Sequence, residues 1–174
     1  MRQIDYNDLK NYQDCKEKKT RTACRAIIIH NDKLAMIQST KFQELKFPGG
    51  GMEDGENHMT CLIREVLEET GLMIQSSSIS PYGLVTDIRR SLFEKDLIFE
   101  MNSYYYLAEM DDTRKGETKL DTYEMEYGYQ LVWVSIDEAI LKNDIAFEKF
   151  NVEAPWVERE LKVLKMLKEE GVLK

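Results

Sequence analysis

The chain has few of the residues that hold small proteins together by covalent or metal cross-links. Its 174 residues include only three cysteines and two histidines. Cys15, Cys24 and Cys61 form an odd count without a C-x-x-C spacing, which argues against a disulfide framework and against a zinc site. His30 and His58 are expected at the surface, without a functional role. This cysteine usage fits a reducing compartment, so we expect a cytoplasmic protein.

Long apolar runs and an excess of basic charge are absent as well. The longest aliphatic run, Ala-Ile-Ile-Ile at 26–29, is far too short for a signal peptide or a membrane span. The 32 acidic residues outnumber the 24 basic ones, which gives a net charge of -8. This balance argues against general binding to nucleic acid and against attachment to an anionic membrane. A phosphorylated ligand would therefore need cations placed locally.

One amphipathic helix with an acidic face is predicted within residues 49–72, which read GGGMEDGENHMTCLIREVLEETGL. Successive helical residues turn by about 100°, so Glu65, Glu68 and Glu69 share one face. The apolar residues form a separate stripe that would pack on a core: Met59, Leu62, Ile63, Val66 and Leu67. The three carboxylates repel one another and lie in the helix half where the dipole disfavours anions. A bound cation would compensate them, and carboxylate oxygens are the ligands that Mg²⁺ prefers.

Both ends of this helix are marked in the sequence. Pro48 and the three glycines after it allow a sharp loop that a ligand can approach closely. Asn57 is a predicted N-cap and Gly71 a predicted C-terminal stop. An isolated E-x-x-E-E more often marks a solvated surface helix. Here the loop, the acidic helix and the stop occur together, which favours a functional site.

The complete pattern in residues 50–72 is G-x5-E-x7-R-E-U-x-E-E-x-G-U, where U is an aliphatic residue. It resembles the Nudix box, the signature of the Nudix hydrolase family, with every defined position filled. The resemblance implies an α/β fold, a Nudix-type α/β/α sandwich with a mixed β-sheet between helices. It also implies hydrolysis of a pyrophosphate bond in a nucleoside diphosphate linked to another moiety, with Mg²⁺ or Mn²⁺ as cofactor. A small-molecule nucleotide is the expected partner, by default a nucleoside triphosphate, an oxidised one included.

The resemblance also implies roles for residues of the box. The metal ligands would be the Gly49 carbonyl and the carboxylates of Glu65, Glu68 and Glu69, which are also the catalytic glutamates. Two further residues would orient this shell through charge-assisted hydrogen bonds: Arg64 and Glu56.

Residues outside the box supply the remaining candidates. The general base is either a box glutamate or one of Glu124 and Glu126. These two residues precede the predicted strand at 129–134, which contains Trp133. Candidate contacts to substrate phosphates are Arg25, Lys46 and Arg89. Phe93 or one of the tyrosines at 104–106 would stack on a base, although packing within the protein or at its surface is the favoured explanation for each of these side chains.

The rest of the chain predicts a single domain at residues 21–174, preceded by a polar, weakly periodic segment at 1–20. That segment is an N-terminal arm or edge strand whose structure we leave open. Strands are predicted at 22–30, 34–38, 72–75, 79–88, 96–110 and 129–134, with a charged loop at 111–122. Helices are predicted at 136–141, after the cap Ser135, and at 155–171.

Two other functions share this fold. A nucleotide-binding sensor or interaction module on a Nudix fold would be expected to lose box carboxylates, and none is missing here. An isomerase of the isopentenyl diphosphate type would need additional cysteine and metal-ligand motifs, which the sequence does not contain. The sequence leaves the oligomeric state open, a homodimer included.

Overall fold

The structure, a computed structural model, describes residues 1–173. Its strands are β1 (Gln3–Asp8), β2 (Glu17–His30), β3 (Lys33–Gln38), β4 (Leu45–Lys46), β5 (Gly49–Gly51), β6 (Leu72–Ile74), β7 (Ser80–Arg90), β8 (Leu97–Ala108), β9 (Met110–Lys115) and β10 (Gln130–Val134). Its helices are α1 (His58–Thr70), α2 (Thr122–Tyr127), α3 (Ile136–Phe150) and α4 (Trp156–Glu169), with a 3-10 turn at Ser76–Ser78. Within residues 1–173 no helix has the length and apolarity that crossing a membrane requires.

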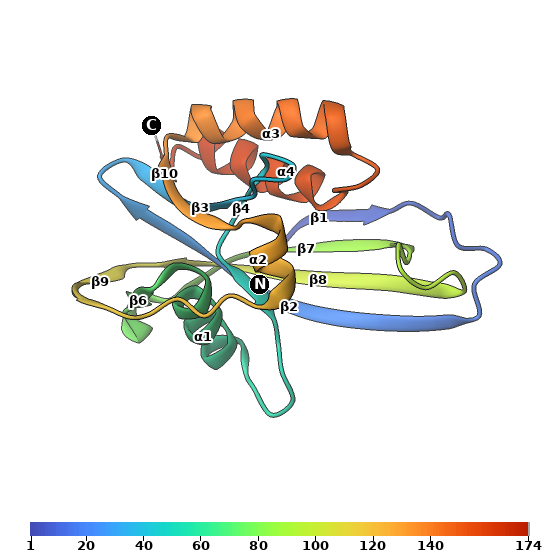
Figure 1. Ribbon diagram of the computed structural model, residues 1–174, viewed down its shortest axis with the longest axis horizontal. Helices are drawn as coiled ribbons and strands as arrows, with labels where there is room; N and C mark the ends of the chain where they lie inside the picture. Colours follow the sequence, from blue (N-terminus) through green and yellow to red (C-terminus); the bar gives the residue numbers. More distant parts are fainter. Residues whose placement is uncertain (174) are drawn as a thin grey trace.

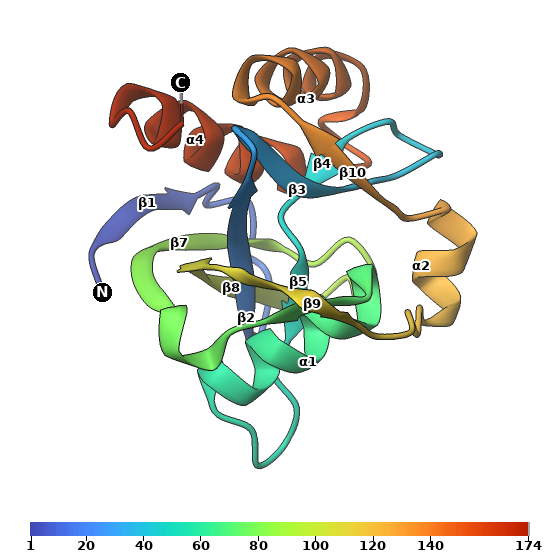
Figure 2. The same ribbon diagram turned by 90° about the vertical axis from the view of Figure 1, so that its left-hand side faces the viewer.

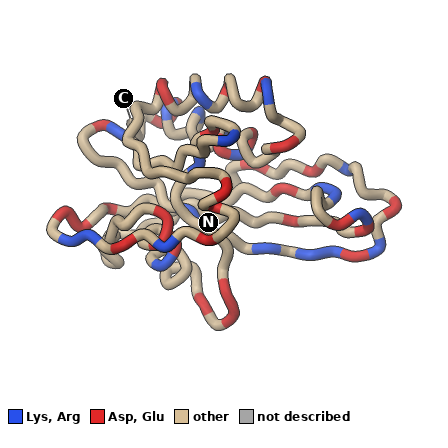
Figure 3. The backbone as a smooth tube through the Cα atoms, in the orientation of Figure 1, with Lys and Arg blue, Asp and Glu red and all other residues tan. Residues whose placement is uncertain are grey.

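The predicted α/β/α sandwich is confirmed. A mixed sheet lies between α1 on one side and the pair α3 and α4 on the other (Figures 1 and 2). Its strands run in the order β1-β7-β8-β2-β3-β10, with β4 paired to β3 and β5 to β2. The pairs β1–β7 and β2–β8 are parallel, and the other pairs are antiparallel. Acidic and basic residues are interspersed over the helices and the strand ends (Figure 3).

Successive side chains of the central strand β2 point to opposite faces of the sheet, and its consecutive apolar residues therefore contribute to both faces. Cys24, Ala26 and Ile28 pack in the core beneath α1, whereas Ile27 belongs to the core beneath α4. The odd-numbered residues nearer the start of β2 therefore emerge on the α4 side. At the N-terminal end of α4 this face of the sheet is no longer covered by apolar packing, and a cavity opens there.

Residues 1–20 contribute β1 and the beginning of β2. β1 pairs with β7 at the edge of the sheet and lies beside α4 (Figure 2). Two ion pairs join the strand to that helix: Asp5 to Lys162 at 2.7 Å and Arg2 to Glu170 at 2.6 Å. The N-terminal strand therefore forms one wall of the region where the cavity opens.

Two predictions of secondary structure are wrong. Residues 111–122 are not a loop throughout, because β9 occupies most of their first half and pairs with β6. The segment that contains Glu124 and Glu126, for which we predicted no element, is the helix α2. The helix predicted at 136–141 continues to Phe150 because the polar Asn143 takes a core position. The Asn143 side-chain amide accepts a hydrogen bond from the Leu45 N–H and donates one to the Leu45 carbonyl.

Candidate active site

The glycine loop lies pressed between β2 and α1. Gly49 has a φ of 136°, and a Cβ at this position would collide with the Cys24 carbonyl. A Cβ on Gly50 would collide with the carboxylate of Glu65. Only glycine allows the backbone to adopt this conformation and this close approach. The loop therefore brings its backbone directly beside the carboxylates of the helix.

The helix begins and ends as the sequence predicts. The Asn57 side chain accepts hydrogen bonds from the N–H groups of Met59 and Thr60, and Gly71 ends the helix in the left-handed conformation. Of the predicted apolar stripe, Leu62 and Val66 are fully buried in the core beneath α1 and Ile63 packs against it, whereas Met59 is exposed. These caps and this stripe fix the direction in which the acidic face points.

Arg64 connects the acidic residues to the glycine loop. Its guanidinium donates to both oxygens of Glu56, at 2.7 and 2.8 Å, and to the Gly51 carbonyl at 3.1 Å. It also donates to Glu65 at 2.8 Å and to Glu68 at 3.0 Å. These bonds lower the pKa of Glu56 to about 2. One guanidinium thus compensates the repulsion that the sequence predicts for the helix face and holds the loop to it.

Glu69 is buried and has a second set of partners. Its carboxylate accepts hydrogen bonds from the Lys46 ammonium at 2.8 Å and from the Gly49 N–H at 2.7 Å. The Lys46 nitrogen also lies 3.9 Å from the centre of the Tyr129 ring. Glu69 therefore ties α1 to the loop and to β4 at once.

Glu65 lies between these two arrangements, half-buried against Gly50. Burial raises the pKa of its carboxyl group, hydrogen bonds from Arg64 oppose that shift, and the nearby charges of Glu69 and Glu68 add to it. A group whose charged form is disfavoured in this way would gain from a nearby cation.

The donor set has the chemistry of a site for a hard divalent cation. Three carboxylates on one helix face and the Gly49 carbonyl supply only oxygen ligands, which Mg²⁺ and Mn²⁺ favour. Within residues 1–173 no three acidic, histidine or cysteine side chains converge on one point, because Arg64 and Lys46 each hold part of the set. The residues fit a metal ion that, on binding, would replace Arg64 and Lys46 as partners of the carboxylates.

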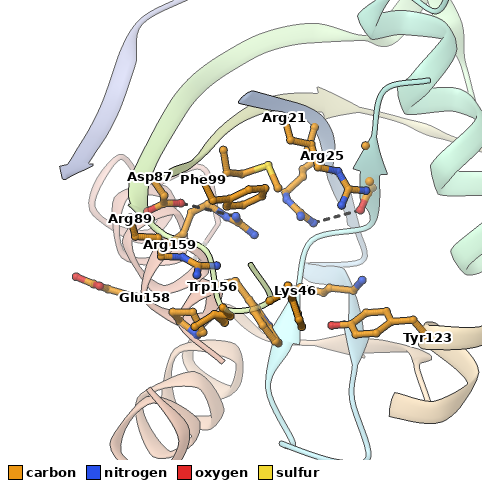
Figure 4. A pocket seen from close by; sticks show the side chains of 18 of the residues that line it. Arg21, Arg25, Lys46, Asp87, Arg89, Phe99, Tyr123, Trp156, Glu158 and Arg159 are labelled. Carbon is orange, nitrogen blue, oxygen red and sulfur yellow. Dashed lines mark hydrogen bonds and ion pairs between the residues drawn. The ribbon is translucent and has the colours of Figure 1, made fainter. Parts of the chain in front are cut away.

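A cavity of about 490 Å³ opens beside this loop and helix. Of the residues predicted for the site, eight line it: Arg25, Lys46, Gly49, Glu65, Glu69, Arg89, Phe93 and Glu124. Its walls come from β1, β2, β7, β8, α2 and the start of α4. Figure 4 shows Asp87, Arg89 and Arg159 on one side of the space, with Lys46 and Tyr123 on the other. The cavity thus has an acidic end, which the box lines, and a distal end that the box does not reach.

Glu124 and Glu126 have different surroundings. Glu124 lines the cavity, and its side chain completes the cap of α2 by accepting from the Asp121 N–H at 2.9 Å. Burial, together with the negative charge of Glu69, raises the pKa of Glu124 to about 7. Glu126 is exposed and lies outside the lining residues of the cavity. Of the two predicted base candidates, only Glu124 faces the box carboxylates.

Arg25 is held in place by the backbone of the loop. Its guanidinium donates to the carbonyls of Phe47 and Gly49, both at 3.2 Å. Its buried Nε atom has no hydrogen-bond partner among residues 1–173 and lies 3.8 Å from Glu160. The cation therefore stands next to the carbonyl that the sequence predicts as a metal ligand.

Of the aromatic candidates, only Phe93 lines the cavity that the structure describes. Phe93 lines the mouth of the cavity and is 88% exposed, whereas Tyr105 is fully buried against Phe47 in the core. Tyr106 accepts or donates a 2.6 Å hydrogen bond with His58. The expectation that His58 is merely solvated is therefore wrong. None of the three tyrosines at 104–106 is among the cavity residues that the structure describes.

Several lining residues were not singled out as site candidates from the sequence: Asp87, Phe99, Met101, Trp156 and Arg159. Phe99 and Met101 alternate with polar residues in β8, and such alternation also fits a strand that enters a core. In the structure this stretch of the strand faces the cavity. A signal was available in β7, where Asp87 and Arg89 place two charges on one face of a strand.

Comparisons with known proteins agree with this geometry. A family model described as the NUDIX domain matches residues 19–154. A Nudix hydrolase from Nitrosomonas europaea shares the fold, with a TM-score of 0.61 and 21% identity over 89% of this chain and 92% of that chain. A MutT Nudix hydrolase from Burkholderia pseudomallei has a TM-score of 0.50 and 17% identity, over 68% and 85%. None of the curated proteins matches the chain. On the family match and the complete box, the chain belongs to the Nudix hydrolase family.

Proposed function

We propose that the protein performs the family's pyrophosphate hydrolysis on a nucleoside diphosphate linked to another moiety, with Mg²⁺ or Mn²⁺ as cofactor. A nucleoside triphosphate, an oxidised one included, is the default substrate. The observation that carries the proposal is that Glu65, Glu69, the glycine loop and Glu124 all line one cavity of about 490 Å³. That cavity also contains Arg25 and Lys46, the local cations that an acidic protein needs to hold a phosphorylated substrate.

The metal would be held by the Gly49 carbonyl and by Glu65, Glu68 and Glu69. When bound, it supplies charge that polarises a phosphoryl oxygen and lowers the pKa of a coordinated water. Arg64 keeps the carboxylates and the loop in register through its bonds to Glu56 and Gly51.

In this proposal Glu124, Lys46 and Arg25 have separate roles in the reaction. Glu124 accepts a proton from the attacking water, whose oxygen forms a bond to phosphorus while the bridging P–O bond breaks. Lys46 donates to Glu69, and it would be free to contact a substrate phosphate if Glu69 held a metal ion instead. Arg25 lies beside the same loop and neutralises charge on the phosphates.

Hydrolysis is tested by a turnover screen over nucleoside triphosphates, nucleotide sugars and dinucleotides. With Mg²⁺ or Mn²⁺ at least one compound should be split at a pyrophosphate bond, and EDTA should stop the reaction. In ¹⁸O-labelled water a phosphate product should carry the label, because water is the attacking group. Tight nucleotide binding without turnover of any compound would favour the sensor module instead.

The metal site makes a separate prediction about stability. With a divalent ion at a hundredfold excess over its dissociation constant, the free energy of unfolding of the wild type should rise by about 2.7 kcal/mol. Glu68→Gln should change the metal-free stability by no more than about 0.5 kcal/mol, because Glu68 is half-exposed and Arg64 keeps its other partners. The same variant should gain clearly less than the wild type from Mn²⁺.

Thermal melts in EDTA and in millimolar Mn²⁺ check this prediction. Glu148→Gln, which removes an exposed charge from α3 far from the box, is the matched control and should respond to Mn²⁺ as the wild type does. Glu69→Gln is less suitable, because the loss of its buried bonds to Lys46 and Gly49 would destabilise the metal-free protein as well. An equal response of the wild type, Glu68→Gln and Glu148→Gln to Mn²⁺ would contradict the role of Glu68 as a metal ligand.

A further inference from the structure

The distal end of the cavity contains a carboxylate whose hydrogen-bonding capacity is only partly used. Asp87 lies on β7 and lines the cavity with 18% of its side chain exposed. Its ion pair with Arg159 is long, at 3.7 Å. Burial raises the pKa of Asp87 in spite of Arg159 and the neighbouring Asn7. A partly buried carboxylate in this situation would be completed by a ligand that brings N–H donors.

A donor stands beside this acceptor on the same face of β7. Arg89 is two residues further along, and its guanidinium carbon lies 5.5 Å from the centre of the Phe99 ring. Its guanidinium donates one hydrogen bond, to the Arg90 carbonyl at 3.4 Å. In the part of the chain that the structure describes, it has no carboxylate oxygen within 4.0 Å. The cavity therefore presents an acceptor and a donor next to each other, and neither group uses all of its hydrogen-bonding capacity.

Flat apolar groups border these two charges. Antiparallel pairing places Met101 opposite Asp87 and Phe99 opposite Arg89, so the two apolar side chains form a floor on the sheet. Trp156, at the start of α4, borders the same space from the helix side (Figure 4). A planar ring bound in this space would have an aromatic floor and an indole available for stacking, which stabilises bases of any sequence.

Part of this end of the cavity lies outside the range that the family model matches. Asn7 precedes residue 19, and Trp156 and Arg159 follow residue 154. The ion pair between Asp5 and Lys162 holds the two outer segments together. Part of the distal wall therefore comes from segments on either side of the matched range.

We infer that the distal end binds a guanine-type base, whose edge presents a carbonyl, a ring N–H and an amino group in a row. Asp87 accepts from the ring N–H and the amino group together, Arg89 donates to the carbonyl, and the ring lies between Phe99 and Trp156. Adenine, cytosine, uracil and hypoxanthine each lack two adjacent donors, so none of them satisfies both carboxylate oxygens. The inference rests on the proposed function in that it names the base of the nucleotide substrate.

Binding of nucleoside monophosphates in EDTA, where no hydrolysis occurs, tests this assignment. Calorimetric titrations would compare GMP, IMP, which lacks only the amino group, and AMP. Wild type should bind GMP about tenfold more tightly than IMP, because one hydrogen bond to a charged acceptor is lost. Asp87→Asn should weaken GMP about tenfold and IMP less than threefold, so that the preference for the amino group disappears. Asp144→Asn, an exposed carboxylate of α3 outside the cavity, should keep the preference.

The ligand series on the wild type keeps the test decisive even if Asp87→Asn folds poorly. Equal binding of GMP and IMP, tighter binding of AMP, or no binding of any of the three at millimolar concentration would overturn the assignment. A guanine preference retained by Asp87→Asn would overturn the role of Asp87. A guanine preference without hydrolysis of any guanine nucleotide contradicts the enzymatic proposal alone, whereas hydrolysis without the preference contradicts this inference alone.

Discussion

Glu124→Gln should lower kcat by roughly 10²–10⁴-fold, the range expected when a general base is removed. Glutamine keeps the size of the side chain and one oxygen, so the hydrogen bond from the Asp121 N–H that caps α2 is retained. The lost function is the ability to accept a proton, which the position of Glu124 in the cavity beside Glu69 makes useful. Steady-state kinetics on the substrate found by the turnover screen, at saturating Mg²⁺, measure the effect.

Glu126→Gln is the matched comparison for this variant. It removes the same charge from the same short helix, but Glu126 is exposed and does not line the cavity. Its kcat should stay within twofold of the wild-type value, and the metal dependence of both variants should resemble that of the wild type. Equal activity of the two variants would return the role of the base to a glutamate of the box.

Most of the catalytic end of the cavity could be predicted from the sequence because its geometry is local. The positions of Glu65, Glu68 and Glu69 relative to one another follow from helical periodicity, and Asn57 and Gly71 fix where the helix begins and ends. The partners within the box are at short sequence distance as well, as with Arg64 and its i+4 neighbour Glu68. Such contacts need no knowledge of the tertiary fold.

The distal end could not be predicted because it depends on which strands become neighbours. Asp87 and Met101 lie opposite each other only through the pairing of β7 with β8, and Trp156 reaches the same space only through the packing of α4. Alternation in β8 identifies a strand with two different faces, but it does not say whether one face is covered. Whether Phe99 lies in a core or in a cavity is decided by where α4 begins.

The burial of Glu160 could not be predicted either, because it also depends on long-range packing. In the sequence Glu160 is one of several glutamates in the predicted C-terminal helix. Its side chain is fully buried and accepts from Arg159 at 2.7 Å and from the Phe47 N–H at 3.3 Å, while Arg25 lies 3.8 Å away. It is thus the carboxylate between two buried guanidinium groups. One of them, Arg25, also donates a hydrogen bond to the Gly49 carbonyl of the glycine loop.

Glu160→Gln should therefore destabilise the protein by about 3–5 kcal/mol, because it leaves Arg25 and Arg159 buried with too little negative charge. For a domain of this size the melting temperature should fall by roughly 10 °C. Glu158→Gln is the control, since Glu158 is two residues earlier, is 39% exposed and pairs with Lys162 at 3.1 Å. Its effect should stay within about 1 kcal/mol. Urea unfolding curves of both variants measure the difference, and similar midpoints would mean that Glu160 does not compensate these guanidinium groups.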